Sequence, residues 1–138
     1  MKLFGKNLLF ANIKYKDIQT EKDKSFRIFG TDKSISLLCS KDINQYFIGT
    51  TYKCLPNDLE DAKSFLVLIG SNNKKDFFQL VLVAILSCED YDLYYSFYNF
   101  LKNTYNWKPN YLTFDFGATN LKAIKEIFGD KENTVIYK

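Results

Sequence analysis

The pattern of hydrophobic and polar positions predicts three strands in the middle of the chain. Residues 45–54 are rich in Tyr, Phe, Ile and Thr and end before the turn-forming residues 56–58, which is typical of a β-strand. Residues 64–70 and 77–88 are nearly continuous apolar runs, separated by the polar residues 71–76. Because such runs are typical of strands covered on both faces, we expect helices on both sides of a sheet.

The period changes after the third strand, where helices and strands are predicted to alternate. Apolar side chains recur at spacings of three and four residues over 92–103, which predicts an amphipathic helix. Residues 111–116 have the composition of a strand, and residues 121–128 predict a second helix that ends at Gly129. Residues 134–137 predict a last short strand. The order of three strands, helix, strand, helix and strand indicates an α/β fold.

The N-terminal part of the chain has a weaker pattern. Residues 7–16 alternate enough to predict a strand, and residues 17–25 have the composition of a charged connector. A helix is predicted to begin at residues 32–34, after a short apolar segment. We therefore divide the chain into an N-terminal extension of undefined structure, residues 1–25, and one domain, residues 26–138.

The composition excludes several classes of active site. The 138 residues include no histidine, which rules out Ser-His-Asp triads, Cys-His dyads, His-ligated zinc and imidazole acid–base chemistry. Cys39, Cys54 and Cys88 are far apart and form no Cys-x-x-Cys pair, which argues against a disulfide framework and a zinc site and favours an intracellular protein, nuclear or cytoplasmic. No apolar run approaches the roughly 20 residues of a membrane span. Any catalysis must therefore use carboxylates, lysines or thiols.

The charge balance permits a nucleic-acid partner without requiring one. Nineteen Lys and Arg residues against sixteen Asp and Glu residues leave a net charge of +3. Arg27 is the only arginine, so the chain has only one side chain suited to bidentate recognition of guanine edges or phosphates. Two interpretations of the lysines are left: diffuse attraction to the phosphates of DNA, or an ordinary solvated surface.

The predicted order of elements is compatible with carboxylate and metal chemistry. Three antiparallel strands followed by alternating helices and strands are the order of an RNase H-like core, in which carboxylates at strand ends hold two divalent metals. The best-placed carboxylate here is Asp115, in an apolar strand just before Gly117. The alternative is a structural role, in which Asp115 forms a turn or caps the following helix.

Several blocks of the chain resemble the transposase domain of Mutator-like elements (MULE). These blocks are residues 29–31, 51–56, 65–70 and 109–116, together with Tyr94, Ala123, Ile124 and Phe128. The resemblance covers residues 26–138, and the order and spacing of the blocks make it more specific than any block alone. It implies an RNase H-like fold and descent from a cut-and-paste DNA transposase whose three acids bind Mg²⁺ or Mn²⁺.

The resemblance also implies that the acidic triad is incomplete. The family has Asp-Gly-Thr in its first core strand, and the acid of this motif falls on Gly49 here. Asp115 matches the second acid, so it is the candidate, vestigial catalytic and metal-binding residue. The third acid of the family lies on a helix beyond the last predicted strand, and the chain stops at Lys138. We therefore expect a degenerate, C-terminally truncated transposase domain that does not cleave DNA by itself.

Other acids do not replace the missing ones in this interpretation, since Glu126, Asp42 and Asp58 are expected to lie on the surface. Two alternatives stay open. The chain could be a fragment of an active, Mg²⁺- or Mn²⁺-dependent DNA transposase whose remaining acids come from elsewhere. It could also be a small α/β interaction or DNA-binding protein whose apolar surface is covered by a protein partner or by another copy of the chain.

Overall fold

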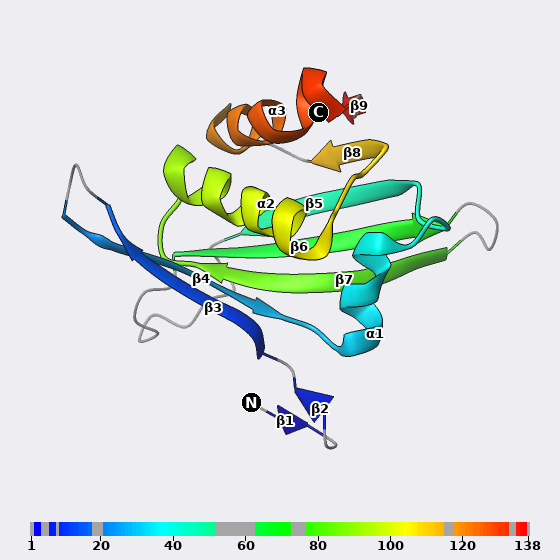
Figure 1. The fold of residues 1–138 in the computed structure, drawn as a ribbon, viewed down its shortest axis with the longest axis horizontal. Coiled ribbons are helices and arrows are strands. Elements are labelled where there is room, and N and C mark those ends of the chain that lie inside the picture. The colour runs from blue at the N-terminus through cyan, green and yellow to red at the C-terminus, as the bar shows by residue number, and fades with distance from the viewer. Residues whose placement is uncertain are drawn as a thin grey trace.

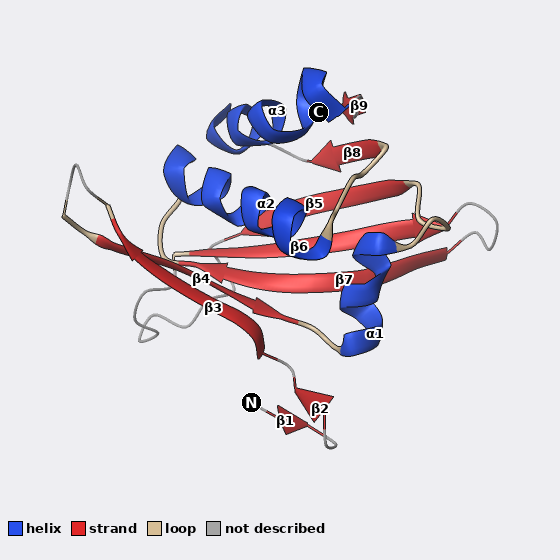
Figure 2. Ribbon diagram, in the orientation of Figure 1, coloured by secondary structure: helices blue, strands red, loops and turns tan. Residues whose placement is uncertain are grey.

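The computed structural model describes residues 2–3, 6–7, 9–17, 21–51, 63–72, 77–114, 118–132 and 135–137. In chain order the elements are β1 (Lys2–Leu3), β2 (Lys6–Asn7), β3 (Leu9–Lys16), β4 (Asp23–Phe29), α1 (Asp32–Ile35), the 3₁₀ helix η1 (Ser36–Cys39), β5 (Gln45–Thr51), β6 (Ser64–Asn72), β7 (Phe77–Leu86), α2 (Tyr91–Tyr105), β8 (Tyr111–Phe114), α3 (Ala118–Glu132) and β9 (Val135–Tyr137). Figure 1 labels them along the chain, and Figure 2 separates helices from strands by colour.

The main sheet has seven strands in the order β3-β4-β7-β6-β5-β8-β9. The pairs from β3 to β5 are antiparallel, whereas β5 pairs with β8, and β8 with β9, in parallel. The strands β1 and β2 form a separate antiparallel pair. The fold is therefore α/β with a mixed sheet, and the predicted order of three strands, helix, strand, helix and strand is confirmed from β5 to β9.

Local signals account for the ends of the helices. Thr31 and Ser34 form a capping box at the start of α1, in which each side-chain oxygen accepts a hydrogen bond from the backbone N–H of the other, at 3.0 and 2.8 Å. Asp90 caps α2 by accepting a hydrogen bond from the N–H of Leu93 at 3.1 Å. The same helix ends where Asn106 takes the left-handed conformation, with a φ of 55°.

The structure corrects two predicted boundaries. The helix expected to end at Gly129 continues to Glu132, because Gly129 does not adopt the left-handed backbone that ends a helix. Residues 17–25 are not all connector, since β4 begins at Asp23. β4 crosses the boundary expected between residues 25 and 26, and its pairing with β3 makes both strands part of the main sheet.

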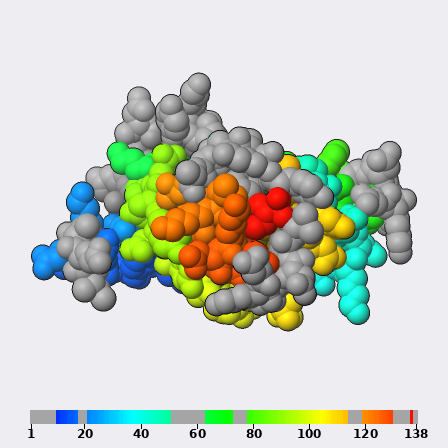
Figure 3. Space-filling model, turned by 90° about the horizontal axis from the view of Figure 1, so that it is seen from above, coloured from blue at the N-terminus to red at the C-terminus, as the bar shows by residue number. Residues whose placement is uncertain are grey.

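The two long helices, α2 and α3, pack on one side of the sheet. Figure 1 shows α2 and α3 on that side, and Figure 3 shows them covering it from above. η1 packs there too, since the hydroxyl of Tyr46 on β5 donates a hydrogen bond to the carbonyl oxygen of Leu37 at 2.8 Å. Along β6, buried residues such as Leu66 and Leu68 alternate with half-buried Phe65 and Val67. Coverage of both faces, which the apolar runs predicted, is therefore wrong for the described residues.

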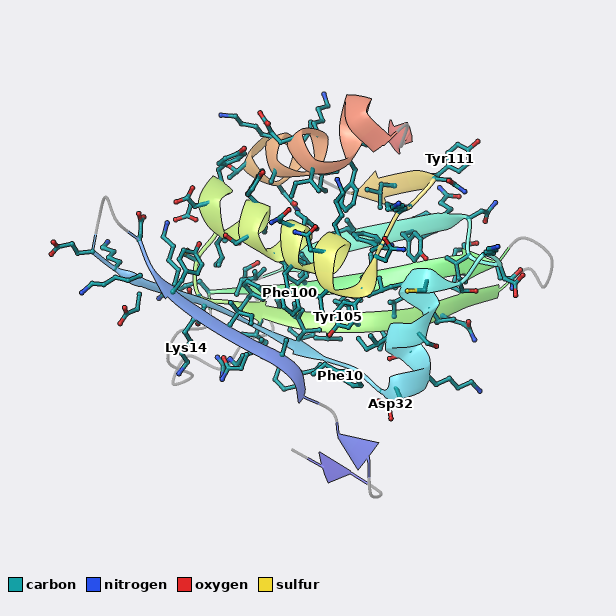
Figure 4. All side chains as sticks on the ribbon, viewed as in Figure 1. Phe10, Lys14, Asp32, Phe100, Tyr105 and Tyr111 are labelled. Carbon is teal, nitrogen blue, oxygen red and sulfur yellow. The ribbon has the colours of Figure 1, made fainter. Side chains whose placement is uncertain are left out.

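Aromatic rings connect the sheet to the helices. Phe26 on β4 makes edge contacts with Phe97 and Phe100 on α2, with ring centroids 5.5 and 5.6 Å apart, and Figure 4 shows Phe100 between the helix and the sheet. Trp107 contacts Tyr46 of β5 at 5.3 Å and Phe128 of α3 at 5.1 Å. Such edge-to-face pairs add to the free energy gained by burial. The path from Tyr46 through Trp107 to Phe128 links β5 with the last helix.

We expect Phe128→Ala to lower the free energy of unfolding by about 3–5 kcal/mol, because it removes a fully buried ring and leaves a cavity beside Trp107. Urea denaturation followed by circular dichroism measures this loss. The matched control is Tyr95→Ala, which shortens an exposed aromatic side chain on α2 and should change the stability by less than about 1 kcal/mol. Equal losses in both variants would contradict this account of the core.

Candidate functional site

The predicted site lies at the edge of the sheet where β5 and β8 end. The two strands run in parallel, with Gln45 opposite Tyr111 and Ile48 opposite Phe114, so their carboxyl ends meet at the same edge. Gly49 is the next residue of β5 toward that edge, and its neighbour on β6 is Val67. Asp115 lies outside the described residues. The structure thus brings the end of β8 beside Gly49, the position where the family's first acid is expected.

The described surroundings of Gly49 contain no ligand set for a divalent metal. Across the sheet Gly49 is followed by Val67 of β6 and Val83 of β7, which have no oxygen ligands in their side chains. Nowhere in the described part of the chain do three or more His, Cys, Asp or Glu residues form a group that could hold a metal ion. The described residues therefore do not fit Mg²⁺ or Mn²⁺, which needs several carboxylate or carbonyl oxygens.

A buried polar pair joins the two large helices. The hydroxyl of Tyr98 on α2 donates a hydrogen bond to Oδ1 of Asn120 in the first turn of α3, at 2.5 Å. Both residues are buried, and Nδ2 of Asn120 has no hydrogen-bond partner among the described residues. Burial raises the pKa of Tyr98 well above its usual value, because the charged phenolate would be desolvated. Tyr98 therefore stays neutral at physiological pH and acts as a hydrogen-bond donor rather than as a general base.

Sequence reasoning did not identify this pair. The spacing of apolar residues predicts an amphipathic helix over 92–103, which includes Tyr98, and the structure buries its ring. No local signal indicated that its hydroxyl would meet Asn120, which is 22 residues away in the chain. A buried hydrogen bond of this kind positions α3 against α2, because an unpaired phenol or amide in the core would be costly.

The acids that do converge in the described residues gather around a lysine. Nζ of Lys24 on β4 lies 2.8 Å from Asp17, 2.7 Å from Asp90 and 3.6 Å from Asp92. Asp17 follows β3, whereas Asp90 caps α2 and Asp92 lies in its first turn. Lys24 and Asp17 are almost completely buried, and the side chains of Asp90 and Asp92 are partly exposed. The ammonium group of Lys24 is thus the common partner of the three carboxylates.

The electrostatics of this cluster are those of a permanent ion pair network. Burial opposes the charge on Lys24, but hydrogen bonds and attraction from Asp17 and Asp90 outweigh it and raise the pKa of Lys24. Burial opposes the charge on Asp90 as well. The ammonium group of Lys24 and the N–H of Leu93 overcome this effect, so the pKa of Asp90 is lowered. A lysine that stays charged cannot act as a nucleophile or a base, so the cluster fastens the β3–β4 hairpin to the start of α2.

The remaining sequence candidates lie apart from these groups. Asp42 and Glu126 are exposed, as predicted, whereas Asp58 and Cys54 lie outside the described residues. Cys39 and Cys88 are free thiols. None of the helices in the described part of the chain is long and apolar enough to span a membrane.

Comparison with known proteins adds no relative. No protein-family model matches the chain, and no curated protein and no solved structure was found to match it. The relationship to transposases therefore remains a prediction from the residue blocks.

We expect Lys24→Met to lower the free energy of unfolding by about 3 kcal/mol, because it leaves the buried carboxylate of Asp17 without its cation. Chemical denaturation at neutral pH measures the loss. Lys16→Met, which removes an exposed lysine from the same hairpin, serves as the control and should change the stability by no more than about 0.5 kcal/mol.

The pH dependence gives an independent check of the same cluster. The lowered pKa of Asp90 stabilises the fold above the usual value of 3.8, and this contribution is lost as the pH falls through the lowered pKa. The raised pKa of Lys24 stabilises the fold below 10.5, and that contribution is lost as the pH rises through the raised pKa. The stability difference between the native chain and Lys24→Met should therefore narrow in acid. A difference independent of pH would contradict the network.

Proposed function

We propose that the chain is an RNase H-like domain related to the DNA transposases of Mutator-like elements, and that it does not cleave DNA by itself. The strand order within the sheet supports this relationship. Antiparallel strands β5, β6 and β7 are followed by β8 and β9, which extend the sheet in parallel from the other side of β5. The helices α2 and α3 make the connections to β8 and β9. This is the succession of elements expected of an RNase H-like core.

The proposal that the domain does not cleave DNA rests on the parallel pairing of β5 with β8. It brings Gly49 and the end of β8 to one edge, where a working member of the family would have acids on both strands. Gly49 supplies no carboxylate, and its neighbours Val67 and Val83 supply none either. Two-metal phosphodiester chemistry needs several carboxylates around a pair of ions about 4 Å apart. With Asp115 as the only matching acid, the domain retains the fold of the family without the chemistry.

The purified chain should show no Mg²⁺- or Mn²⁺-dependent nicking of labelled duplex DNA, and Asp115→Asn should leave that result unchanged. Glu126→Gln is the control, since Glu126 is an exposed acid on α3. Metal-dependent nicking that is abolished by Asp115→Asn but kept in Glu126→Gln would show an active site and refute the proposal.

Restoring the missing acid tests the location of the site directly. We expect Gly49→Asp to raise the affinity of the chain for Mn²⁺ by at least about tenfold, because a second carboxylate at this edge adds hard oxygen ligands. Adding Asp115→Asn to Gly49→Asp should remove the gain. Isothermal titration calorimetry measures both.

The matched control is Thr50→Asp. Thr50 is opposite Leu66 and points to the helix side of the sheet, because successive side chains of a strand alternate between faces. A similar gain in Mn²⁺ affinity from Thr50→Asp, or a gain from Gly49→Asp that survives Asp115→Asn, would place the metal ligands elsewhere.

A further inference from the structure

β3 is the outermost strand on one side of the main sheet. The order β3-β4-β7-β6-β5-β8-β9 gives it a single neighbour, β4, and Figure 1 shows it along the edge of the sheet. No other strand in the described part of the chain pairs with it. An edge strand of eight residues presents a row of backbone N–H and C=O groups to which a further strand can bond.

A backbone hydrogen bond at the end of the β3–β4 hairpin shows which residues of β3 turn these groups outward. The N–H of Asp17 donates to the carbonyl oxygen of Lys22 at 2.8 Å, so Asp17 directs its N–H toward the β4 side of the hairpin. Bonded and non-bonded pairs alternate along an antiparallel ladder. By the register, Lys16, Lys14 and Asn12 therefore direct their N–H and C=O groups away from β4.

The backbone of β4 confirms this direction independently. Ser25 lies opposite Lys14. Its N–H donates to Oγ of Ser87 at 2.8 Å, and its carbonyl oxygen accepts a hydrogen bond from the N–H of Ser87 at 2.9 Å. Both backbone groups of Ser25 are thus directed toward the end of β7 and away from β3. The N–H and C=O groups of Lys14 point to the outer edge, where a partner strand would lie.

The two faces of β3 differ in chemistry. Ile13 lies opposite Phe26, whose ring contacts Phe100 of α2 at 5.6 Å, so Ile13 faces the helices. Tyr15 lies on the same face, because side chains of a strand alternate, and both residues are hydrophobic and half-buried. Figure 4 shows Lys14 on the side of β3 away from α2. A strand added at this edge would meet a hydrophobic stripe on one face and a basic stripe on the other.

The basic stripe consists of Lys14 and Lys16, which are both exposed. Asp23 of β4 lies opposite Lys16 and offsets its charge, whereas Lys14 lies opposite the uncharged Ser25. Arg27, two residues from Ser25 on the same face of β4, adds a further cation. β3 itself contains no acid. A strand with an acidic side chain opposite Lys14 would therefore supply the charge that this edge lacks among the described residues.

A hollow adjoins the same part of the hairpin. Its volume is about 330 Å³, and it is lined by Lys14, Tyr15, Lys16, Asp23, Lys24 and Ser25. This volume is at the lower end of the roughly 300–1,000 Å³ of small-ligand pockets, so it has room for a side chain of a partner. The two exposed lysines of β3 are part of its lining, which favours a side chain with a negative charge.

Other partners fit this edge less well. Lysines on an edge strand keep copies of the same strand from pairing with each other. Two β3 strands side by side would bring their lysines to one face with no acid between them, because β3 contains none. A nucleic acid would be attracted by the lysines, but it would leave the hydrophobic stripe and the outward N–H and C=O groups unused.

We propose that β3 binds an extended peptide segment as an added antiparallel strand, in which acidic side chains alternate with apolar ones. The acids lie opposite Asn12, Lys14 and Lys16, and the apolar side chains cover Ile13 and Tyr15. The antiparallel direction continues that of β3, β4 and β7. In this mode of recognition the backbone hydrogen bonds provide affinity, and the alternating side chains provide specificity. The proposal does not depend on the relationship to transposases.

Fluorescence anisotropy with a labelled peptide of alternating glutamate and valine, as long as β3, tests the proposal. The native chain should bind it at least about tenfold more tightly than a peptide of alternating lysine and valine, because the charges opposite Lys14 are reversed. Lys14→Glu should weaken binding of the glutamate peptide by about tenfold, since it turns an attraction into a repulsion. Lys125→Glu makes the same change at an exposed lysine of α3, and this matched control should bind like the native chain.

Methylated peptides test the strand pairing itself on the native chain. In an antiparallel pair, residues that exchange hydrogen bonds lie directly opposite each other with their side chains on one face. The N–H groups of the glutamates should therefore face β3, and those of the valines should face away from it. Methylation of the glutamate nitrogens should abolish binding, whereas methylation of the valine nitrogens should leave most of it. The reverse result would overturn the antiparallel arrangement.

The remaining outcomes are equally decisive. Equal affinity of the native chain for the glutamate and lysine peptides would overturn the proposal, as would equal affinity of Lys14→Glu and Lys125→Glu for the glutamate peptide. Circular dichroism should show that both variants remain folded, and the methylated peptides keep the test valid if one does not. A dimer of the native chain that the glutamate peptide dissociates would assign the edge to a second copy. Single-stranded DNA that binds more tightly than the glutamate peptide, and is lost in Lys14→Glu, would assign it to a nucleic acid.

Discussion

The parallel pairing of β5 with β8 is the constraint on which the rest of the fold depends. Two parallel strands cannot be joined by a tight turn, so the chain between β5 and β8 needs a long connection. This connection first adds β6 and β7 to the sheet and then crosses one face of the sheet as α2. Trp107 stabilises this connection, because its ring contacts Tyr46 of β5 and Phe128 of the last helix. The same pairing sets the strand edge at which the proposed relationship to transposases predicts the acids.

Convergence of carboxylates in this chain stabilises structure rather than forming a metal site among the described residues. Asp17, Asp90 and Asp92 approach one another only because Lys24 lies between them. The cost of burying an ammonium group is offset by two short ion pairs, and the N–H groups at the start of α2 favour the acids as well. At the β5–β8 edge, the position at which the first acid is expected is occupied by Gly49, and valines of β6 and β7 lie beside it. The acids that converge in the described residues thus stabilise the fold.

Local patterns predicted most of the elements because the signals that form them are local. Period-two and apolar runs gave β5, β6 and β7, and the three-to-four spacing gave α2 within two residues at each end. The errors, by contrast, have causes in the tertiary structure. Gly129 is a common helix terminator, yet the packing of Ile127 and Phe128 in the core favours continuation of α3 beyond it. The start of β4 was not predicted, because its residues Lys24 and Ser25 are polar and become buried only when the hairpin packs against α2 and β7.

The sequence by itself determined the α/β succession of elements and excluded imidazole chemistry, since both follow from residue types and their spacing. The position of Gly49 within the candidate site also came from the order of residue blocks. Only the tertiary structure decided which face of the sheet is covered, because continuous apolar runs in β6 and β7 satisfy one-sided and two-sided burial alike. It also decided the partners of Lys24 and Tyr98. Asp90 is 66 positions from Lys24 and Asn120 is 22 from Tyr98, and contacts at such separations arise from the paths of whole strands and helices.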